Sequence, residues 1–265
     1  LVQDEYPNVF FILIDGEPHT ADYSTFRTAP NTLSILFNEH ESGFLAAYSV
    51  VADGFTELGF LGGMAVPAVV RFGVGFVGGS YFAAAELGND TFEFDPAYYD
   101  YLGDFAPNDQ HKTKAASWYN DGVEVIHAAA GGAGNSVMSA AEELTEKWVV
   151  GVDIDQSIES DTVITSALKG LAVAVQTALA DIYAQEFVGG YTLVLGAAEE
   201  AVGIPTAVGS FDLFTTFDLV AYTNIFNRLS SGVAGAPKDA DQLEKYIEAL
   251  GYEVPAGLID KIKGN

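Results

Sequence analysis

A strand, a glycine-rich turn, a helix and a second strand follow one another between residues 123 and 155. The apolar run Val123–Ala130 is short and partly β-branched, which is typical of a buried parallel strand. The turn Gly131–Gly134 follows, and Asn135 and Ser136 are residue types that begin helices. A second apolar run, Trp148–Val152, ends at an aspartate. This order predicts a strand–helix–strand unit of an open α/β sheet.

The same alternation continues along the rest of the chain, where short apolar runs are separated by longer segments of helical periodicity. A helix remnant is expected at Leu1–Tyr6, before the first strand. Further strands are expected at Asn8–Ile14, Thr32–Phe37, Leu58–Leu61, Phe92–Leu102, Thr162–Thr165 and Tyr191–Leu195. Further helices are expected at Gly43–Asp53, Pro67–Leu87, Pro107–Asn120, Ala167–Phe187, Thr216–Leu229 and Asp239–Leu250. Strands that alternate with helices predict an α/β fold with a mostly parallel sheet.

Charge and cysteine content exclude several functions. The formal net charge is −26 with 11 Lys and Arg residues, which argues against binding nucleic acid or anionic lipid. There is no cysteine, so disulfides, thiolate metal sites and a cysteine nucleophile are excluded. We expect no membrane span, since apolar runs stay shorter than the roughly 20 residues that a span requires. The excess of acidic residues is interpreted as a solvated acidic surface.

Residues at the ends of the expected strands are the candidates for a ligand site, because ligands of open α/β sheets bind beyond the carboxyl ends of the strands. Asp15, Phe105 and Asp153 stand at such ends. An aromatic ring at position 105 can stack on a planar ligand, an interaction worth roughly 1–3 kcal/mol. Asp153 can accept two hydrogen bonds from vicinal hydroxyls. The alternatives are a core phenylalanine and an aspartate that caps a turn.

Three further features belong to the same hypothesis. Asp155, two residues after Asp153, offers the same carboxylate chemistry. Lys169, expected at the start of a long helix, could orient Asp153 and donate to a ligand hydroxyl, or be a surface lysine. Gly131 and Gly132 would let a ligand approach the backbone, although close helix packing explains them equally well. The order G-G-A-G-N-S-V matches neither a phosphate loop nor the dinucleotide fingerprint.

Catalytic patterns are poor, so we expect a protein that is not an enzyme and uses no cofactor or metal. His19, His40, His111 and His127 do not form a paired metal-binding motif, and G-x-S-x-G does not occur. His127 lies within an apolar strand and is interpreted as a core residue. An α/β enzyme with a nucleotide cofactor is kept as a less favoured alternative.

Several ordered motifs resemble the basic membrane protein family, the lipoproteins of bacterial ABC importers that include purine nucleoside-binding proteins. The resemblance rests on Gly43–Tyr48 (G-F-L-A-A-Y), Leu58–Phe76, Gly103–Asp109 (G-D-F-A-P-N-D), Val125–Gly134, Gly151–Gln156 (G-V-D-I-D-Q) and Thr165–Lys169 (T-S-A-L-K).

The resemblance implies a periplasmic-binding-protein-like fold with two Rossmann-like lobes. Residues 1–58 would form lobe I, residues 59–188 lobe II, and residues 189–265 the return to lobe I and the C-terminal helices. In nucleoside-binding members two aromatics, one per lobe, sandwich the base. By this resemblance, Phe105 is the second-lobe aromatic and Asp15 is a first-lobe carboxylate. Gly131 or Gly132 would contact the ligand through the backbone. Asp153 and Lys169 would hold the ribose, with Asp155 as the competing choice for the carboxylate.

The resemblance also implies partners and a location. We expect a monomer that works with an ABC transporter permease at the extracellular face of the membrane or in the periplasm. The first strands of lobe I, the other aromatic and a lipid-anchor cysteine are expected on an N-terminal segment that precedes Leu1. Alternatives within the same fold are a sugar, a diol signal or a free base as ligand. A surface protein that acts in adhesion is a further alternative, with no sequence signature.

Overall fold

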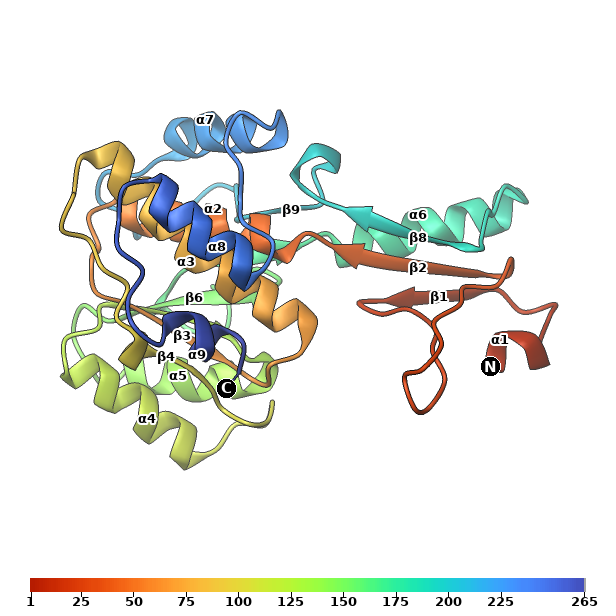
Figure 1. Ribbon diagram of the computed structural model, residues 1–265, viewed down its shortest axis with the longest axis horizontal. Helices are drawn as coiled ribbons and strands as arrows, with labels where there is room; N and C mark the ends of the chain where they lie inside the picture. Colours follow the sequence, from red (N-terminus) through yellow and green to blue (C-terminus); the bar gives the residue numbers. More distant parts are fainter. Residues whose placement is uncertain (265) are drawn as a thin grey trace.

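The protein, described for residues 1–264 by a computed structural model, consists of two units built around separate sheets (Figure 1). The small unit holds a three-stranded parallel sheet in the order β1-β2-β8, and the large unit a six-stranded sheet in the order β4-β3-β5-β6-β7-β9. β9 alone runs antiparallel to its neighbour, which confirms the mostly parallel α/β fold. The strands are β1 (Phe11–Ile14), β2 (Thr32–Phe37), β3 (Leu58–Gly62), β4 (Tyr99–Tyr101), β5 (Val125–Ala129), β6 (Trp148–Asp153), β7 (Val163–Lys169), β8 (Tyr191–Leu195) and β9 (Val202–Gly203).

Helices cover both faces of the large sheet, which explains why its strands read as continuous apolar runs. Side chains alternate along each strand: Phe60 and Val125 join one core, while Leu61 and Ile126 join the other. Helices α2 (Glu39–Ala52) and α3 (Pro67–Leu87) belong to the first core, and α4 (Asp109–Asn120) and α5 (Gly134–Ala141) to the second. The C-terminal helices α7 (Leu219–Ser230), α8 (Ala240–Ala249) and α9 (Leu258–Ile262) extend the first core.

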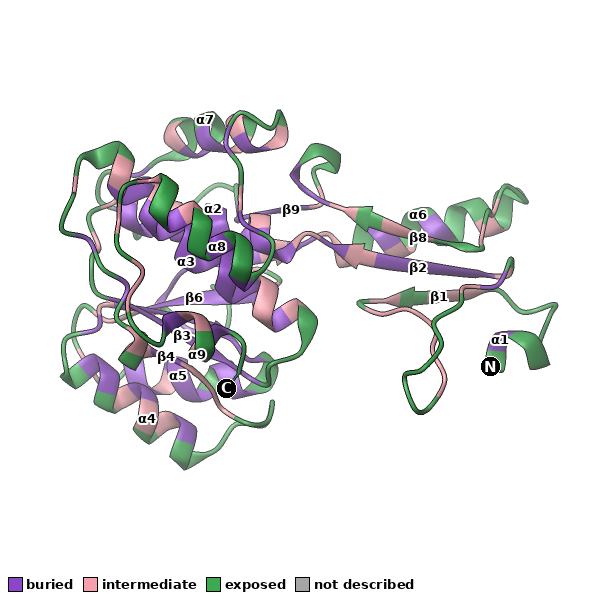
Figure 2. Ribbon diagram, viewed as in Figure 1, coloured by how far each residue is buried: buried purple, intermediate pink, exposed green. Residues whose placement is uncertain are grey.

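The small unit is less well covered. Helix α6 (Leu171–Ala184) lies beside its sheet and buries mainly Ala174 and Ala178, and the short helix α1 (Val2–Glu5) lies at its far end (Figure 2). Exposed apolar side chains remain on the sheet, among them Leu13 and Val194. The large unit therefore holds most of the hydrophobic core.

Helices α2 and α3 are in close contact because glycines line the crossing. A Cβ at Gly75 would lie 1.9 Å from the carbonyl oxygen of His40, and one at Gly79 would lie 2.2 Å from that of Phe44. Among residues 1–264, α3 is long and apolar enough by length and composition to cross a membrane, contrary to the sequence-based expectation. Since 72% of its apolar window is buried inside the protein, we interpret α3 as a core helix.

The chain crosses between the two units after β2, after β7 and between β8 and β9. The boundary expected at residue 58 therefore falls inside the large unit, because α2 packs on α3 there. The boundary expected at residue 188 lies next to β8, but α6, which precedes it, already belongs to the small unit. Beyond β9 the described chain stays with the large unit, so the expected return to lobe I is limited to β8.

Several expected elements have different bounds in the structure, and three of them show why. The strand expected at Thr162–Thr165 continues to Lys169, so that lysine ends β7 and does not open the next helix. The strand expected at Phe92–Leu102 is reduced to β4, because Pro96 begins a 3-10 turn, η1 (Pro96–Tyr98), with Asp95 as its cap. The helix expected from Thr216 begins at Leu219, where the Asp218 carboxylate accepts hydrogen bonds from two first-turn amides.

Candidate functional site

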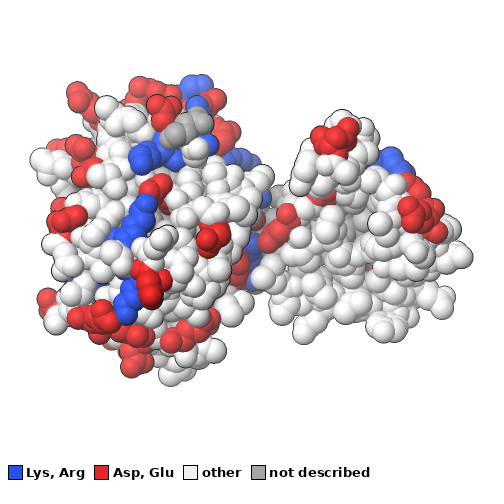
Figure 3. Space-filling model, turned by 90° about the horizontal axis from the view of Figure 1, so that it is seen from below, with Lys and Arg blue, Asp and Glu red and all other residues white. Residues whose placement is uncertain are grey.

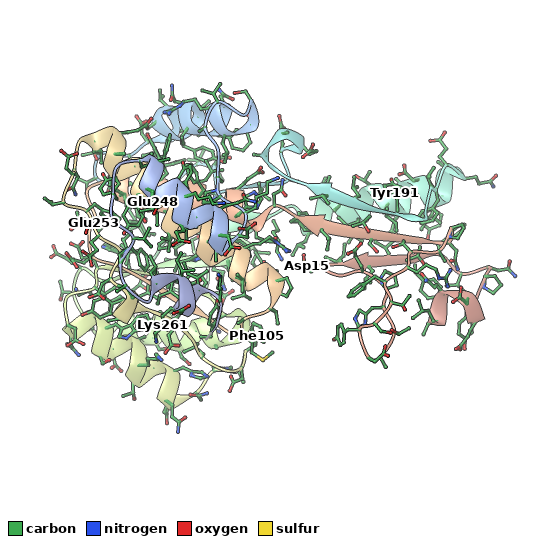
Figure 4. The ribbon with its side chains drawn as sticks, in the orientation of Figure 1. Asp15, Phe105, Tyr191, Glu248, Glu253 and Lys261 are labelled. Atoms are coloured by element: carbon green, nitrogen blue, oxygen red, sulfur yellow. The ribbon has the colours of Figure 1, made fainter. Side chains whose placement is uncertain are left out.

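A cavity of about 300 Å³ lies where the small unit meets the carboxyl ends of the large sheet's strands. Asp15, at the end of β1, faces it from the small unit, while Phe105 lies on the adjoining edge of the large unit (Figure 4). Figure 3 shows acidic and basic side chains at the narrow junction between the units. The lining residues are Asp15, Val66, Pro67, Ala68, Val69, Phe72, Phe105, Ala129, Gly131, Val152, Asp153 and Lys169.

Lys169 is the central cation of this cavity. Its Nζ lies 2.5 Å from Asp15 Oδ2 and 3.1 Å from Asp153 Oδ1, and its side chain is only 3% exposed. The rings of Phe37 and Phe72 flank the ammonium at 5.8 and 5.6 Å. Burial by itself would lower the pKa of Lys169, but Asp153 and Asp15 outweigh it and raise that pKa. The lysine is therefore charged at neutral pH and joins the two units.

Both aspartates at this site have a left-handed backbone. The φ angle is 58° at Asp15 and 67° at Asp153, each at the point where a parallel strand ends. Aspartate tolerates this region better than most residues, yet the conformation is sparsely populated and concentrates at functional sites. The amide of Asp15 donates to the carbonyl of Ile35 at 2.9 Å, which fixes the carboxylate at the sheet edge.

The Phe105 ring is held at the rim of the cavity by its loop. Asp104, just before it, accepts hydrogen bonds from the amide of Ala106 and from Nε2 of His111, and these two contacts lower the pKa of Asp104. The carbonyl of Phe105 accepts from the amide of Ala133 at 2.9 Å. The ring is 37% exposed and lines the cavity, so it is not the core phenylalanine of the alternative interpretation.

Glycines make room for this ring. A Cβ added at Gly63 would lie 2.3 Å from Cδ1 and Cε1 of Phe105, and one at Gly131 would lie 3.5 Å from Cδ1. Gly131 also has a φ angle of 53° at the start of the 3-10 turn η2 (Gly131–Ala133). Gly132 follows it in the turn but is not among the lining residues.

The structure thus brings Asp15, Phe105, Gly131, Asp153 and Lys169 together around one cavity. Of the other two candidates, Gly132 does not line this cavity, and neither does Asp155. It lines a different cavity, and its Oδ1 accepts a hydrogen bond from the amide of Ser157. Of the two competing carboxylates, Asp153 is therefore the one placed beside the lysine. That these residues contact a ligand stays a prediction.

Sequence reasoning missed the first turn of α3, which contributes Pro67, Ala68 and Val69 to the lining. The signal was present: Pro67 follows Gly62 and Gly63, which close β3. A helix that begins directly after a parallel strand must start at the same sheet edge as the other strand ends. Glu39, the buried first residue of α2, was also missed; its Oε2 lies 2.5 Å from Nε of Arg71.

Comparison with known proteins identifies relatives of this arrangement. Residues 1–221 match the family described as ABC transporter substrate-binding protein PnrA-like. Basic membrane protein D of Borreliella burgdorferi is 32% identical over 205 residues, which cover 76% of this chain and 56% of that protein. The ABC transporter nucleoside-binding protein BmpA of Lactococcus lactis is 28% identical over 188 residues, which cover 64% of this chain and 49% of that protein. The chain therefore spans about half the length of these curated relatives.

A solved structure shows the fold. The crystal structure of an ABC transporter solute-binding protein from Aeropyrum pernix superposes with a TM-score of 0.71. The sequence identity is 24%, and the superposition covers 98% of this chain and 78% of that one. The periplasmic-binding-protein-like fold expected from the sequence is confirmed by this likeness.

Proposed function

The chain belongs to the family of PnrA-like substrate-binding proteins of ABC transporters, as its motifs indicated, and from this premise we propose that it binds a purine nucleoside in the cavity between its two units. The family is one of solute-binding proteins, so the protein acts by binding and release, without catalysis. The Lactococcus lactis relative is named as a nucleoside-binding protein, which supports this choice of ligand.

One observation carries the proposal: Phe105, Asp153 and Lys169 line the same cavity. A flat base can rest on the exposed face of the Phe105 ring, with a stacking energy of roughly 1–3 kcal/mol. The ribose then extends toward Asp153, whose carboxylate accepts from hydroxyl groups, and toward Lys169, whose ammonium donates to them. A backbone contact at Gly131 or Gly132 and a further carboxylate at Asp15 complete the site.

The charge of the cavity favours a neutral ligand. Lys169 Nζ lies within 4 Å of oxygens of Asp15, Asp153 and Glu39, and Arg71 is the additional cation beside Glu39. Carboxylates therefore outnumber cations in this group. A nucleotide phosphate would meet repulsion here, whereas a nucleoside offers hydroxyl groups that suit both signs of charge.

Binding is coupled to closure of the two units. Ligand that contacts both Asp15 and Phe105 bridges the units and shifts their population toward the closed state, which the transporter permease recognises. The protein works as a monomer outside the cytoplasm, held at the membrane by a lipid-modified segment of the longer protein. Asp155 lies outside the cavity and takes no part in this proposal.

Calorimetry with inosine, guanosine, adenosine and free ribose tests the proposal. A nucleoside at a hundredfold excess over its dissociation constant should stabilise the protein by roughly 2.7 kcal/mol. The variant Phe105→Ala should bind nucleosides about 5-fold to 150-fold more weakly, because the stacking energy is lost. Phe26→Ala, which removes an exposed phenylalanine that is not among the lining residues, is the matched control.

The alternatives predict different results. If a sugar, a diol or a free base is the ligand, that compound gives the signal and nucleosides do not. A small polyol should also bind Phe105→Ala almost as well as the parent protein, since it has no flat ring to stack. Release of free base from a nucleoside during the titration would instead indicate an enzyme.

A further inference from the structure

Glu39 is a buried carboxylate that the proposed ligand contacts leave without a role. It begins α2, directly after the crossing from the small unit, and its side chain is 0% exposed. Its Oε2 accepts a hydrogen bond from Nε of Arg71 at 2.5 Å. Within residues 1–264, Oε1 has no hydrogen-bond partner and lies 3.9 Å from Nζ of Lys169.

Burying the Glu39 carboxylate costs free energy, because a charged group removed from water loses its hydration. Burial accordingly raises the pKa of Glu39, although Arg71 and Lys169 act in the opposite direction. Arg71 compensates one oxygen, and the other oxygen faces the ammonium of the ligand site. Glu39 thus lies close to Lys169 without being one of the residues that line the cavity.

The carboxylates around Lys169 differ in what a ligand can reach. Asp15 and Asp153 are 33% and 41% exposed and line the cavity, so ligand hydroxyls can occupy their lone pairs. Glu39 is shielded from the ligand. Glu39 and Lys169 both belong to the large unit, so their separation does not depend on how far the units open, whereas the contact with Asp15 does.

We propose that Glu39 is a positioning residue of the ligand site, which holds Lys169 in place and charged when Asp15 and Asp153 turn to the ligand. The inference rests on the proposed function. Arg71 fixes Glu39 in turn, and α3, which carries Arg71, lines the cavity with its first turn. Arg71 and Glu39 therefore form a chain of charges that ends at Lys169, which lines the cavity.

The first experiment needs no ligand. The Lys169 side chain is followed by NMR as a function of pH in the parent protein, in Glu39→Gln and in Glu39→Asp. The groups that face it are Asp15, Asp153 and Glu39, and the neighbouring His40 is uncharged, because burial lowers its pKa to about 3. Glu39→Gln should lower the pKa of Lys169, and Glu39→Asp, which keeps the charge, should restore it.

The second experiment measures nucleoside affinity by calorimetry. Glu39→Gln should bind at least about tenfold more weakly, because an ammonium that loses its fixed counter-ion is held less well. The double variant E39Q/R71Q, which leaves no unpaired arginine, should behave in the same way and guards against a folding defect. Glu86→Gln, which breaks another Glu–Arg pair on α3, far along the helix from the cavity, is the matched control and should bind as the parent does.

Two outcomes overturn the inference. One is a Lys169 titration that is the same in the parent and in Glu39→Gln. The other is a nucleoside affinity that is unchanged in Glu39→Gln and in E39Q/R71Q. If the parent protein binds no nucleoside, the proposed function fails by itself, and the ligand-free titration still decides whether Glu39 acts on Lys169.

Discussion

Replacing Gly63 by alanine should weaken ligand binding while leaving the protein folded. The φ angle of Gly63 is not in the left-handed region, so its backbone accepts a side chain. The added Cβ would lie 2.3 Å from two carbons of the Phe105 ring. Carbon atoms pack at about 3.5–4.0 Å, so the ring must move outward by at least about 1.2 Å. Because the ring is 37% exposed, it can move into solvent without disturbing the core.

The size of the effect follows from the role proposed for the ring. A displacement of this kind removes the ring from the plane on which a base would stack, an interaction worth roughly 1–3 kcal/mol. Affinity should therefore fall about 5-fold to 150-fold. The cost to folding should be about 1–2 kcal/mol, since the ring can give way but the carbonyl oxygen of Asp104, 3.1 Å from the added Cβ, must also shift.

Calorimetry with inosine and urea unfolding measure the two quantities separately. Gly134→Ala is the control, because its Cβ would meet its nearest neighbours at ordinary contacts of 3.7 and 3.8 Å. In a double-mutant cycle, Gly63→Ala should add nothing to Phe105→Ala. The reasoning is refuted if Gly63→Ala binds like the parent protein, or if the two substitutions weaken binding additively.

Two further predictions concern stability. Gly75→Ala should destabilise the protein by about 3 kcal/mol or more, because the added Cβ would lie 1.9 Å from a backbone oxygen of α2. Urea unfolding measures this against the control Gly235→Ala, whose added Cβ would meet no atom within 4 Å. Equal stabilities of the two variants would contradict the prediction. The hydrogen bond from Arg228 lowers the pKa of Glu86 below its ordinary value of 4.5. The ionised carboxylate therefore stabilises the fold fully above pH 4.5, and this contribution is lost as the pH falls through the pKa of Glu86 in the folded protein. The stability difference between the parent and Glu86→Gln should therefore shrink from neutral pH to about pH 3 in unfolding titrations, and a constant difference would argue against the ion pair.

The fold could be predicted well where one pattern allowed one structure. Val125–Ala129 and Trp148–Val152 are short and almost entirely apolar, which favours central parallel strands, and in the structure nearly all of their residues are buried. Boundaries were less certain where local and tertiary effects compete. Phe92–Leu102 is rich in aromatics, yet Pro96 ends the extended conformation. Lys169 reads as a helix residue, but pairing with β6 and β9 extends the strand as far as this lysine.

The candidate site, like the fold, could be predicted in part from the sequence. Strand ends are visible in sequence, and the rule that ligands bind beyond them places Asp15, Phe105 and Asp153 at one edge. The sequence does not reveal which strand end of the small unit faces which strand end of the large unit, because this depends on how the two units pack. Asp153 and Asp155 are two residues apart and chemically alike, and only the turn after β6 separates them into different cavities. Nothing in the sequence distinguishes Glu39 from the many other carboxylates, yet the structure buries it fully.

Under the proposed function, the ammonium of Lys169 would bond both to the two aspartates and to the ligand hydroxyls. This competition limits how much Lys169 can add to the binding free energy. Its ammonium contacts Asp15 and Asp153. A ligand hydroxyl that bonds to these groups exchanges one set of hydrogen bonds for another, and such exchanges contribute little net free energy. Under the proposed function, the polar groups would select the ligand by orientation, and most of the affinity would come from the Phe105 ring and the apolar residues of α3 that line the cavity. For this reason a displaced ring should cost more binding free energy than the loss of any one hydroxyl contact.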